Sequence, residues 1–172
     1  MFVADLHNDV LQRAINGEDI INKTSNGHSD VERLIEAKIN LEVFVVWITK
    51  QYLKHSPFNR ANELINKLEE IERKSQNLTI VRSYHDIISI NKKSHLAAAF
   101  GIEGGECLEN NIDNLDYFIK KGLLYFGPTW NYSNLLATSA YDETHNLDKI
   151  NSLGLTNFGK DAIKICEDSG VL

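Results

Sequence analysis

The chain has 172 residues, of which 42% are hydrophobic and 24% are charged, as in an ordinary globular protein. This length suits one domain with a substantial core, so we expect a single domain over residues 1–172. The formal net charge of −6 argues against nucleic-acid and anionic-membrane partners, because both require a basic surface.

Cysteine content and the N-terminus indicate a cytoplasmic protein. Cys107 and Cys166 form no CxxC pair and are too few for a disulfide framework, so we expect free thiols in a reducing compartment. Residues 1–5 reach a charged side chain at once and do not resemble a signal peptide. No apolar stretch approaches the roughly 20 residues that a membrane span requires.

The first expected strand covers residues 2–6 and ends at the triplet His7-Asn8-Asp9. Ser29 and Glu32 then fit a capping box, in which the serine caps a helix that runs to Lys38. These segments form the first strand–helix unit.

A second unit begins with residues 42–48, whose apolar side chains are continuous and β-branched, as in a strand buried on both faces. Ser56 and Pro57 fit a cap followed by proline at the first helical position. Residues 78–81 are a short strand candidate and residues 84–91 a weak helix. One apolar face is expected on the long helix, formed by Ala61, Leu64, Ile65, Leu68 and Ile71.

Two further strands are expected at residues 96–102 and 123–127, separated by a helix over residues 112–119 that Gly122 closes. Thr156 can cap the last helix, and residues 171–172 look like the start of another strand. The apolar side of this last helix would bury Phe158, Ala162, Ile165 and Cys166. This alternation predicts a parallel α/β fold, namely the first four strand–helix units of a (β/α)8 barrel.

His7 and Asp9 are candidate metal ligands. Alternate residues at the end of a strand point the same way, so the two side chains can converge on one point. An imidazole and a carboxylate together suit Zn²⁺ or a similar divalent ion. The alternative is a turn aspartate beside a hydrogen-bonded histidine.

Glu103 is the candidate catalytic carboxylate. It follows a buried strand and precedes Gly104 and Gly105, which allow a tight turn. A carboxylate at the carboxyl end of a barrel strand occupies the catalytic position of that fold, and it could bridge two metal ions. The alternative is a glutamate that backbone N–H groups satisfy at a helix start.

Trp130 and Asn131 follow the strand at residues 123–127 and are candidate substrate-binding residues. The alternative for Trp130 is a half-buried core position. The remaining histidines suggest no partners, and we expect structural or exposed roles for His28, His55, His85, His95 and His145.

Five motifs in order carry a family resemblance over nearly the whole chain. They are residues 5–9 (D-x-H-N-D), 28–34 (similar to H-T-D-L-x-R-L), 102–105 (I-E-G-G), 122–131 (similar to G-x-R-Y-x-T-L-T-H/W-N) and 154–159 (G-L-T-x-F-G). Together they resemble the membrane dipeptidase, or renal dipeptidase, family of metallopeptidases. That resemblance implies an amidohydrolase-type barrel with two zinc ions per complete site, acting on dipeptides or related small amides.

The resemblance also assigns roles to the candidate residues. His7 and Asp9 would bind the first metal, Glu103 would bridge both, and a bridging hydroxide would attack the peptide carbonyl. Trp130 stands where well-known members have a histidine that contacts the substrate, a departure that bears on oxyanion stabilisation.

The family's other metal histidines, its substrate-binding arginine and its acid/base aspartate would fall beyond Leu172. We therefore expect this chain alone to bind one metal or none and to be inactive or nearly so. Uncovered sheet edges predict a homo-oligomer or pairing with a complementary C-terminal half. Two alternatives stay open: a non-catalytic fragment or assembly module with a vestigial metal site, and an amidohydrolase with a different amide substrate.

Overall fold

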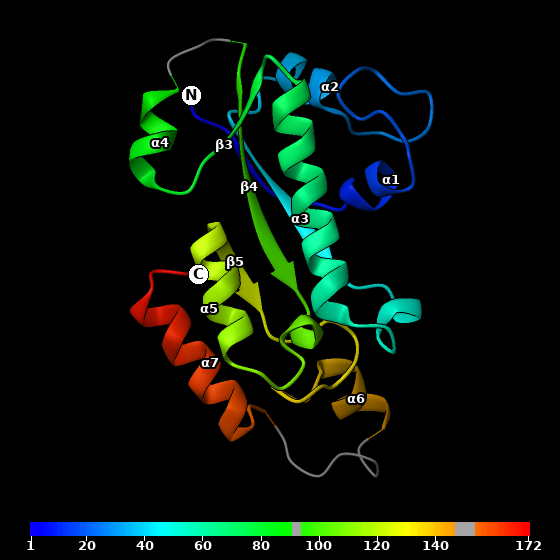
Figure 1. The fold of residues 1–172 in the computed structure, drawn as a ribbon, viewed down its shortest axis with the longest axis vertical. Coiled ribbons are helices and arrows are strands. Elements are labelled where there is room, and N and C mark those ends of the chain that lie inside the picture. The colour runs from blue at the N-terminus through cyan, green and yellow to red at the C-terminus, as the bar shows by residue number, and fades with distance from the viewer. Residues whose placement is uncertain (91–93, 147–153) are drawn as a thin grey trace. The chain divides into compact units, whose positions relative to one another are not determined.

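The computed structural model describes residues 1–90, 94–146 and 154–172, which fold into two compact units (Figure 1). The first unit comprises Met1–Val46 and Asn62–Gly101, and the second comprises Trp47–Ala61 and Ile102–Leu172. The expectation of a single domain over residues 1–172 stays a prediction.

A parallel sheet organises the chain, as expected. Its strands are β1 (Ala4–Asn8), β2 (Leu41–Trp47), β3 (Leu78–Ile80), β4 (Leu96–Glu103) and β5 (Leu123–Gly127). The strand order is β1-β2-β4-β3, and β5 pairs with β4. β1 runs parallel to β2 and β3 runs parallel to β4, which requires crossover connections of the kind that helices supply.

The strand boundaries differ from the expected ones mainly at β1. The other four strands lie within one residue of the expected segments, whereas β1 begins two residues later and includes His7 and Asn8. The reason is that β1 is exposed along most of its length, so its ends are set by pairing with β2 rather than by an apolar pattern.

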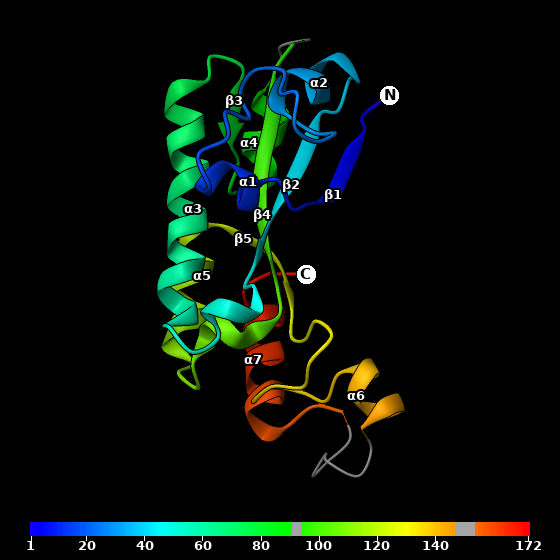
Figure 2. The same cartoon turned by 90° about the vertical axis from the view of Figure 1, so that its right-hand side faces the viewer.

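Helix α3 (Pro57–Lys74) begins at the expected proline, and in the first unit it packs along β4 (Figures 1 and 2). β2 and β4 are buried along nearly their whole length, which explains their continuous apolar sequences. Each fully buried leucine or isoleucine contributes roughly 1.5–3 kcal/mol to folding. The expected apolar face of α3 is confirmed, since Ala61, Leu64, Ile65, Leu68 and Ile71 are all buried.

Helix α2 (Val31–Glu36) has a different cap from the one expected. Asp30 rather than Ser29 is the N-cap, and its Oδ1 accepts a hydrogen bond of 2.8 Å from the Arg33 backbone N–H. Ser29 instead accepts from the Asn8 amide, and Glu32 accepts from the Lys23 backbone N–H. Asp30 prevails because its second oxygen also binds the Thr24 N–H and the Arg33 guanidinium, so one buried carboxylate satisfies several donors. The helix also ends two residues before Lys38.

Short helices complete the two units. They are α1 (Leu11–Ile15) and α4 (Tyr84–Ser89) in the first, and η1 (Lys50–Tyr52), η2 (Gly105–Leu108), α5 (Asp113–Lys121), α6 (Ala140–His145) and α7 (Asn157–Asp168) in the second. Gly122 ends α5 with a φ of 98°, in the left-handed region that glycine adopts easily. Within the described ranges, no helix combines the length and apolarity that crossing a membrane demands.

Helix α7 confirms its expected cap, because Thr156 accepts a hydrogen bond of 3.0 Å from the Gly159 N–H. Its buried stripe is narrower than expected. Ala162 and Cys166 are buried together with Gly159, whereas Phe158 and Ile165 lie at the margin of this stripe and are only half-buried.

Leu172 continues the sheet pattern beside β5. The Phe126 N–H donates to the Leu172 carbonyl over 2.8 Å, and the Leu172 N–H donates to the Leu124 carbonyl over 3.0 Å. When one residue forms hydrogen bonds to two residues that are two positions apart on the neighbouring strand, the two segments run parallel. Residues 171–172 are not assigned as a strand, but this pairing agrees with the strand expected to begin there.

Candidate functional site

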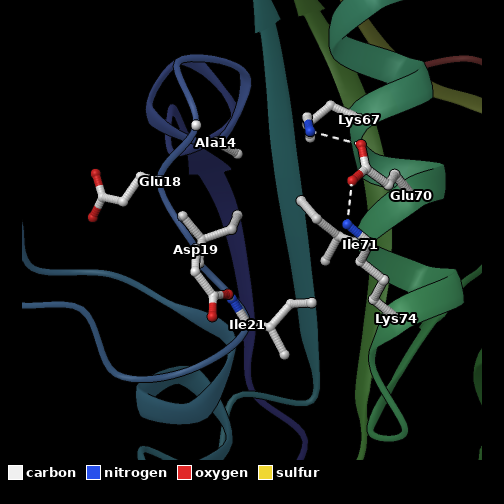
Figure 3. Close-up of a pocket in the computed structure, with 10 residues that line it drawn as sticks. Ala14, Glu18, Asp19, Ile21, Lys67, Glu70, Ile71 and Lys74 are labelled. Carbon is white, nitrogen blue, oxygen red and sulfur yellow. Dashed lines mark hydrogen bonds and ion pairs between the residues drawn. The ribbon is translucent and has the colours of Figure 1, made fainter.

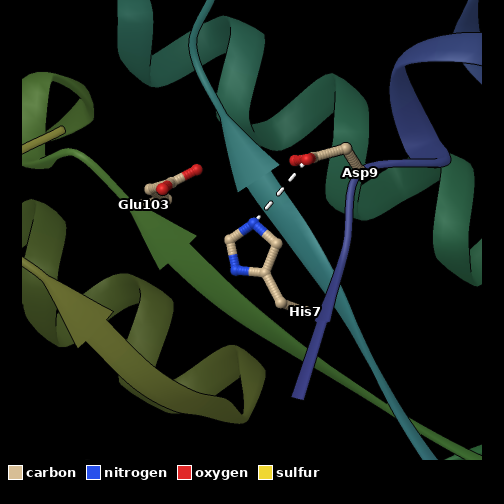
Figure 4. A group of neighbouring side chains, drawn as sticks. All are labelled: His7, Asp9 and Glu103. Carbon is tan, nitrogen blue, oxygen red and sulfur yellow. Dashed lines mark ion pairs between the residues drawn. The ribbon is translucent and has the colours of Figure 1, made fainter. Parts of the chain in front are cut away.

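His7 and Asp9 approach each other at the carboxyl end of β1 in the first unit. His7 Nε2 lies 3.6 Å from Asp9 Oδ2, and the two side chains are 48% and 55% exposed. Figure 4 shows this pair as a dashed line, with the imidazole and the carboxylate turned toward each other. An imidazole and a carboxylate are both ligand types that Zn²⁺ takes in proteins.

The register of β1 against β2 shifts next to these two side chains. Asp5 pairs with Glu42 and Asn8 pairs with Phe44, so β1 carries one residue more than β2 over this stretch. Asn8 takes a structural role, since its amide donates to Ser29 Oγ over 2.7 Å and its Oδ1 accepts from the Val10 N–H over 3.1 Å. These two hydrogen bonds fix the turn after β1. A β-bulge at such a register shift commonly changes the direction of side chains near active sites.

Glu103 is the last residue of β4 and is half-buried in the second unit. Gly104 has a φ of 85°, and a Cβ there would overlap the Glu106 carboxylate. A Cβ on Gly105 would overlap a methyl group of Leu136. The expected tight turn is therefore present, and both glycines are needed for it.

The three expected ligands come from both units: His7 and Asp9 from the first and Glu103 from the second. Each stands at the carboxyl end of a strand of a parallel sheet, the edge at which barrel enzymes place their catalytic groups. That they share one ion is a proposal. Figure 4 draws all three side chains.

Trp130 lies three residues after β5, half-buried among other aromatic rings of the second unit. Its ring centroid is 4.8 Å from that of Trp47 and 5.6 Å from that of Tyr132. Lys50 Nζ lies 5.5 Å from the Tyr132 centroid. Asn131 is exposed, and its carbonyl accepts a hydrogen bond from Ser139 Oγ.

Sequence reasoning missed Trp47 as a neighbour of Trp130 and Lys50 as a neighbour of Tyr132. The available signal was position, because Trp47 closes an apolar strand at the same edge of the sheet as the other candidates. The other histidines stay outside the site. His28, His55, His85 and His145 are exposed, and His95 hydrogen-bonds Thr79 Oγ1 over 2.8 Å.

Glu42 was also missed. It is fully buried on β2 opposite Asp5, and among the described residues neither of its carboxylate oxygens has a partner at hydrogen-bond geometry. Burial raises the pKa of Glu42 to about 7, a smaller effect of the nearby Asn8 amide lowers it, and the Asp5 charge adds a small further rise. A charged residue inside an apolar strand was the signal.

A cavity of about 350 Å³ in the first unit lies between the segment after α1 and helix α3 (Figure 3). Its two lysines pair with a carboxylate of the same cavity, since Glu70 lies 2.6 Å from both Lys67 and Lys74. These two lysines hold the pKa of the half-buried Glu70 carboxyl well below its ordinary value, at about 2. Because the cations of this cavity are already paired, it does not compete with the strand ends as a site for chemistry.

Comparison with known proteins supplies a family. The sequence model of membrane dipeptidases (peptidase family M19) matches residues 1–172. The "Uncharacterized protein in PQQ-III 3′ region" of Acinetobacter calcoaceticus is 28% identical over 95% of the chain and 59% of its own length. "Dipeptidase 3" of Macaca fascicularis is 24% identical over 99% of the chain and 35% of its own length.

Solved structures share the fold. A structure described as dipeptidase AC, a metallopeptidase of family M19, superposes with a TM-score of 0.82 at 20% identity, covering all of this chain and 55% of its own. A metallopeptidase from Rhodobacter sphaeroides, liganded with a phosphinate mimic of the dipeptide L-Ala-D-Ala, gives 0.82 at 19% identity and 57% coverage. The expected fold, the N-terminal half of a (β/α)8 barrel, is confirmed. The chain spans little more than half of these solved relatives.

Proposed function

Because the chain belongs to the membrane dipeptidase family, peptidase family M19, we propose that it supplies the His7, Asp9 and Glu103 side of a zinc-dependent dipeptidase site. The observation that carries this proposal is the set of donors at the strand ends, one imidazole and two carboxylates. This combination suits Zn²⁺, and its place suits a barrel enzyme.

Each of these residues would have a distinct role at the metal. His7 offers a ring nitrogen beside Asp9, and Glu103 offers a second carboxylate whose backbone the two following glycines hold in a tight turn. Two negative charges balance the charge of a divalent ion. A bound ion of this kind supplies Lewis-acid polarisation of the scissile carbonyl and makes water more acidic.

We propose a dipeptide or a related small amide as substrate. The relatives described as dipeptidases support this, as does the phosphinate dipeptide mimic bound by the Rhodobacter sphaeroides enzyme. Trp130 and Asn131 would line the substrate side of the site, since both follow the strand next to β4. For its location we propose the cytoplasm, as the sequence indicates.

We further propose that residues 1–172 form an incomplete site. The chain covers 55% and 57% of the two solved relatives, so the remaining ligands and the proton-transfer group would come from a complementary C-terminal half or from another copy. By itself the chain should hydrolyse dipeptides slowly or not at all, because losing the groups that move protons removes most of the rate.

The test is hydrolysis of L-dipeptides by the purified 172-residue chain with added Zn²⁺, beside Glu103→Gln as control. We expect no turnover above the control, and we expect zinc to bind the wild type more tightly than the variant. Turnover well above Glu103→Gln would refute the incomplete site. Equal zinc affinity of the two proteins would refute the assignment of Glu103.

A further inference from the structure

Four side chains of the second unit form what we call the aromatic wall: Trp47, Trp130, Tyr132 and Lys50. The Trp47 and Trp130 rings are tilted at 59°, and the Trp130 and Tyr132 rings meet edge to face at 74°. Both tryptophans are half-buried, and Tyr132 is 38% exposed. The wall therefore keeps aromatic surface in contact with solvent, unlike a closed core cluster.

The wall stands beside Glu103. The Gly104 N–H donates to the Gly127 carbonyl over 2.9 Å, and a Cβ on Gly127 would lie 3.9 Å from the Cα atom of Glu103. Gly127 ends β5, and Trp130 follows it by three residues. Gly127 therefore lies against the Glu103 backbone, and Trp130 of the aromatic wall follows three residues later.

Lys50 gives the wall a charged end. Its ammonium lies 5.5 Å from the Tyr132 ring centroid, within cation–π range. Among the residues that the structure describes, no carboxylate forms an ion pair with Lys50, which is exposed. A π surface that ends in an available ammonium suits a ligand with a large apolar group next to a carboxylate.

We infer that the aromatic wall is the subsite for the carboxyl-terminal residue of the peptide. An aromatic or large apolar side chain packs on Trp130 and Tyr132, and the free carboxylate pairs with Lys50. Trp47 is a positioning residue, because it packs against Trp130 from the end of β2. The inference rests on the proposed function, in which Glu103 brings the scissile amide next to the wall.

The chain offers a direct reporter, since Trp47 and Trp130 are its only two tryptophans. We would titrate the zinc-supplemented chain with Gly-Phe, Gly-Gly and Gly-Phe amide, and follow tryptophan fluorescence. Burying a phenyl ring on a partly exposed wall predicts a Kd for Gly-Phe about tenfold below that for Gly-Gly. An exposed lysine predicts a preference of about twofold to fivefold for Gly-Phe over its amide.

Two variants separate the two contacts while keeping both tryptophans. Tyr132→Ala should reduce the preference for Gly-Phe over Gly-Gly. Lys50→Gln should abolish the preference for the acid over the amide and leave the phenyl preference intact. Lys54→Gln, at an exposed lysine just after η1, is the matched control and should change neither preference.

Failure of this inference differs from failure of the proposed function. Equal Kd values for Gly-Phe and Gly-Gly, or no fluorescence response to any peptide, would overturn the subsite even if Glu103→Gln weakens zinc binding. If the preference for Gly-Phe is retained but Glu103→Gln leaves the zinc affinity unchanged, the aromatic wall is supported as a peptide site and the metal assignment is overturned.

Discussion

Glu42 should make the stability of this protein depend on pH. Its side chain is fully buried, and burial raises its pKa from 4.5 to about 7. The folded state therefore favours the protonated form, so the wild type should lose stability as the pH rises from the unfolded pKa through the folded one. Glu42→Gln keeps the size of the side chain and removes the titration, so the variant should lack this loss.

The difference between the folded and unfolded pKa values of Glu42 sets the size of this change in unfolding free energy. The interval between 4.5 and about 7 corresponds to about 3 kcal/mol of unfolding free energy, at about 1.4 kcal/mol per pH unit. The full effect should appear above the folded pKa. Well below the unfolded pKa, the carboxyl is protonated in both states and the wild type and the variant should converge.

Urea unfolding followed by far-UV circular dichroism at about pH 5 and about pH 8 measures this difference. Glu42→Gln should be more stable than wild type by about 3 kcal/mol at the higher pH and by less than about 1 kcal/mol at the lower one. Glu63→Gln makes the same change on the exposed side of α3 and should follow the wild type. If wild type and Glu42→Gln show the same pH dependence, the reasoning about this buried carboxyl is wrong.

Three further changes test the local structure. Gly105→Ala would place a Cβ against Leu136, so thermal unfolding should show a loss of about 1–3 kcal/mol, and an unchanged melting temperature would contradict the close approach. Asp30→Ala removes the cap of α2 and the partner of Arg33, with an expected loss of about 2 kcal/mol in urea unfolding, whereas Asp30→Asn should lose less because it can still cap. Cys107 is fully buried, and burial raises the pKa of its thiol, so Cys107 should react with a thiol reagent only on unfolding; rapid modification of native Cys107 would show that it is accessible.

The buried strands were predictable because burial on both faces leaves a continuous apolar run. β2 and β4 carry this signal, β5 has a continuous apolar run although it is only partly buried, and the structure places all three within a residue of the expected segments. β1 begins two residues later than expected because most of its side chains are exposed and give no apolar pattern. Helices α1 and α6 were missed because five or six residues give too few helical turns for a periodic pattern.

The candidate ligands were predictable because they stand in compact motifs at the carboxyl ends of strands, as His7 and Asp9 do on either side of Asn8. Other features depend on partners distant in sequence. Glu42 acquires its environment from pairing opposite Asp5 across the sheet, and no local pattern predicts such a register. The contact between Trp47 and Trp130 likewise joins residues at the ends of two separate strands.

Calorimetric zinc titration of wild type, His7→Ala and Glu103→Gln tests the proposal that His7, Asp9 and Glu103 hold one zinc ion. We expect one zinc per wild-type chain and a loss of affinity of at least about tenfold in each variant, because each removes one metal ligand. Zinc binding by Glu103→Gln with the affinity of the wild type would contradict the shared site.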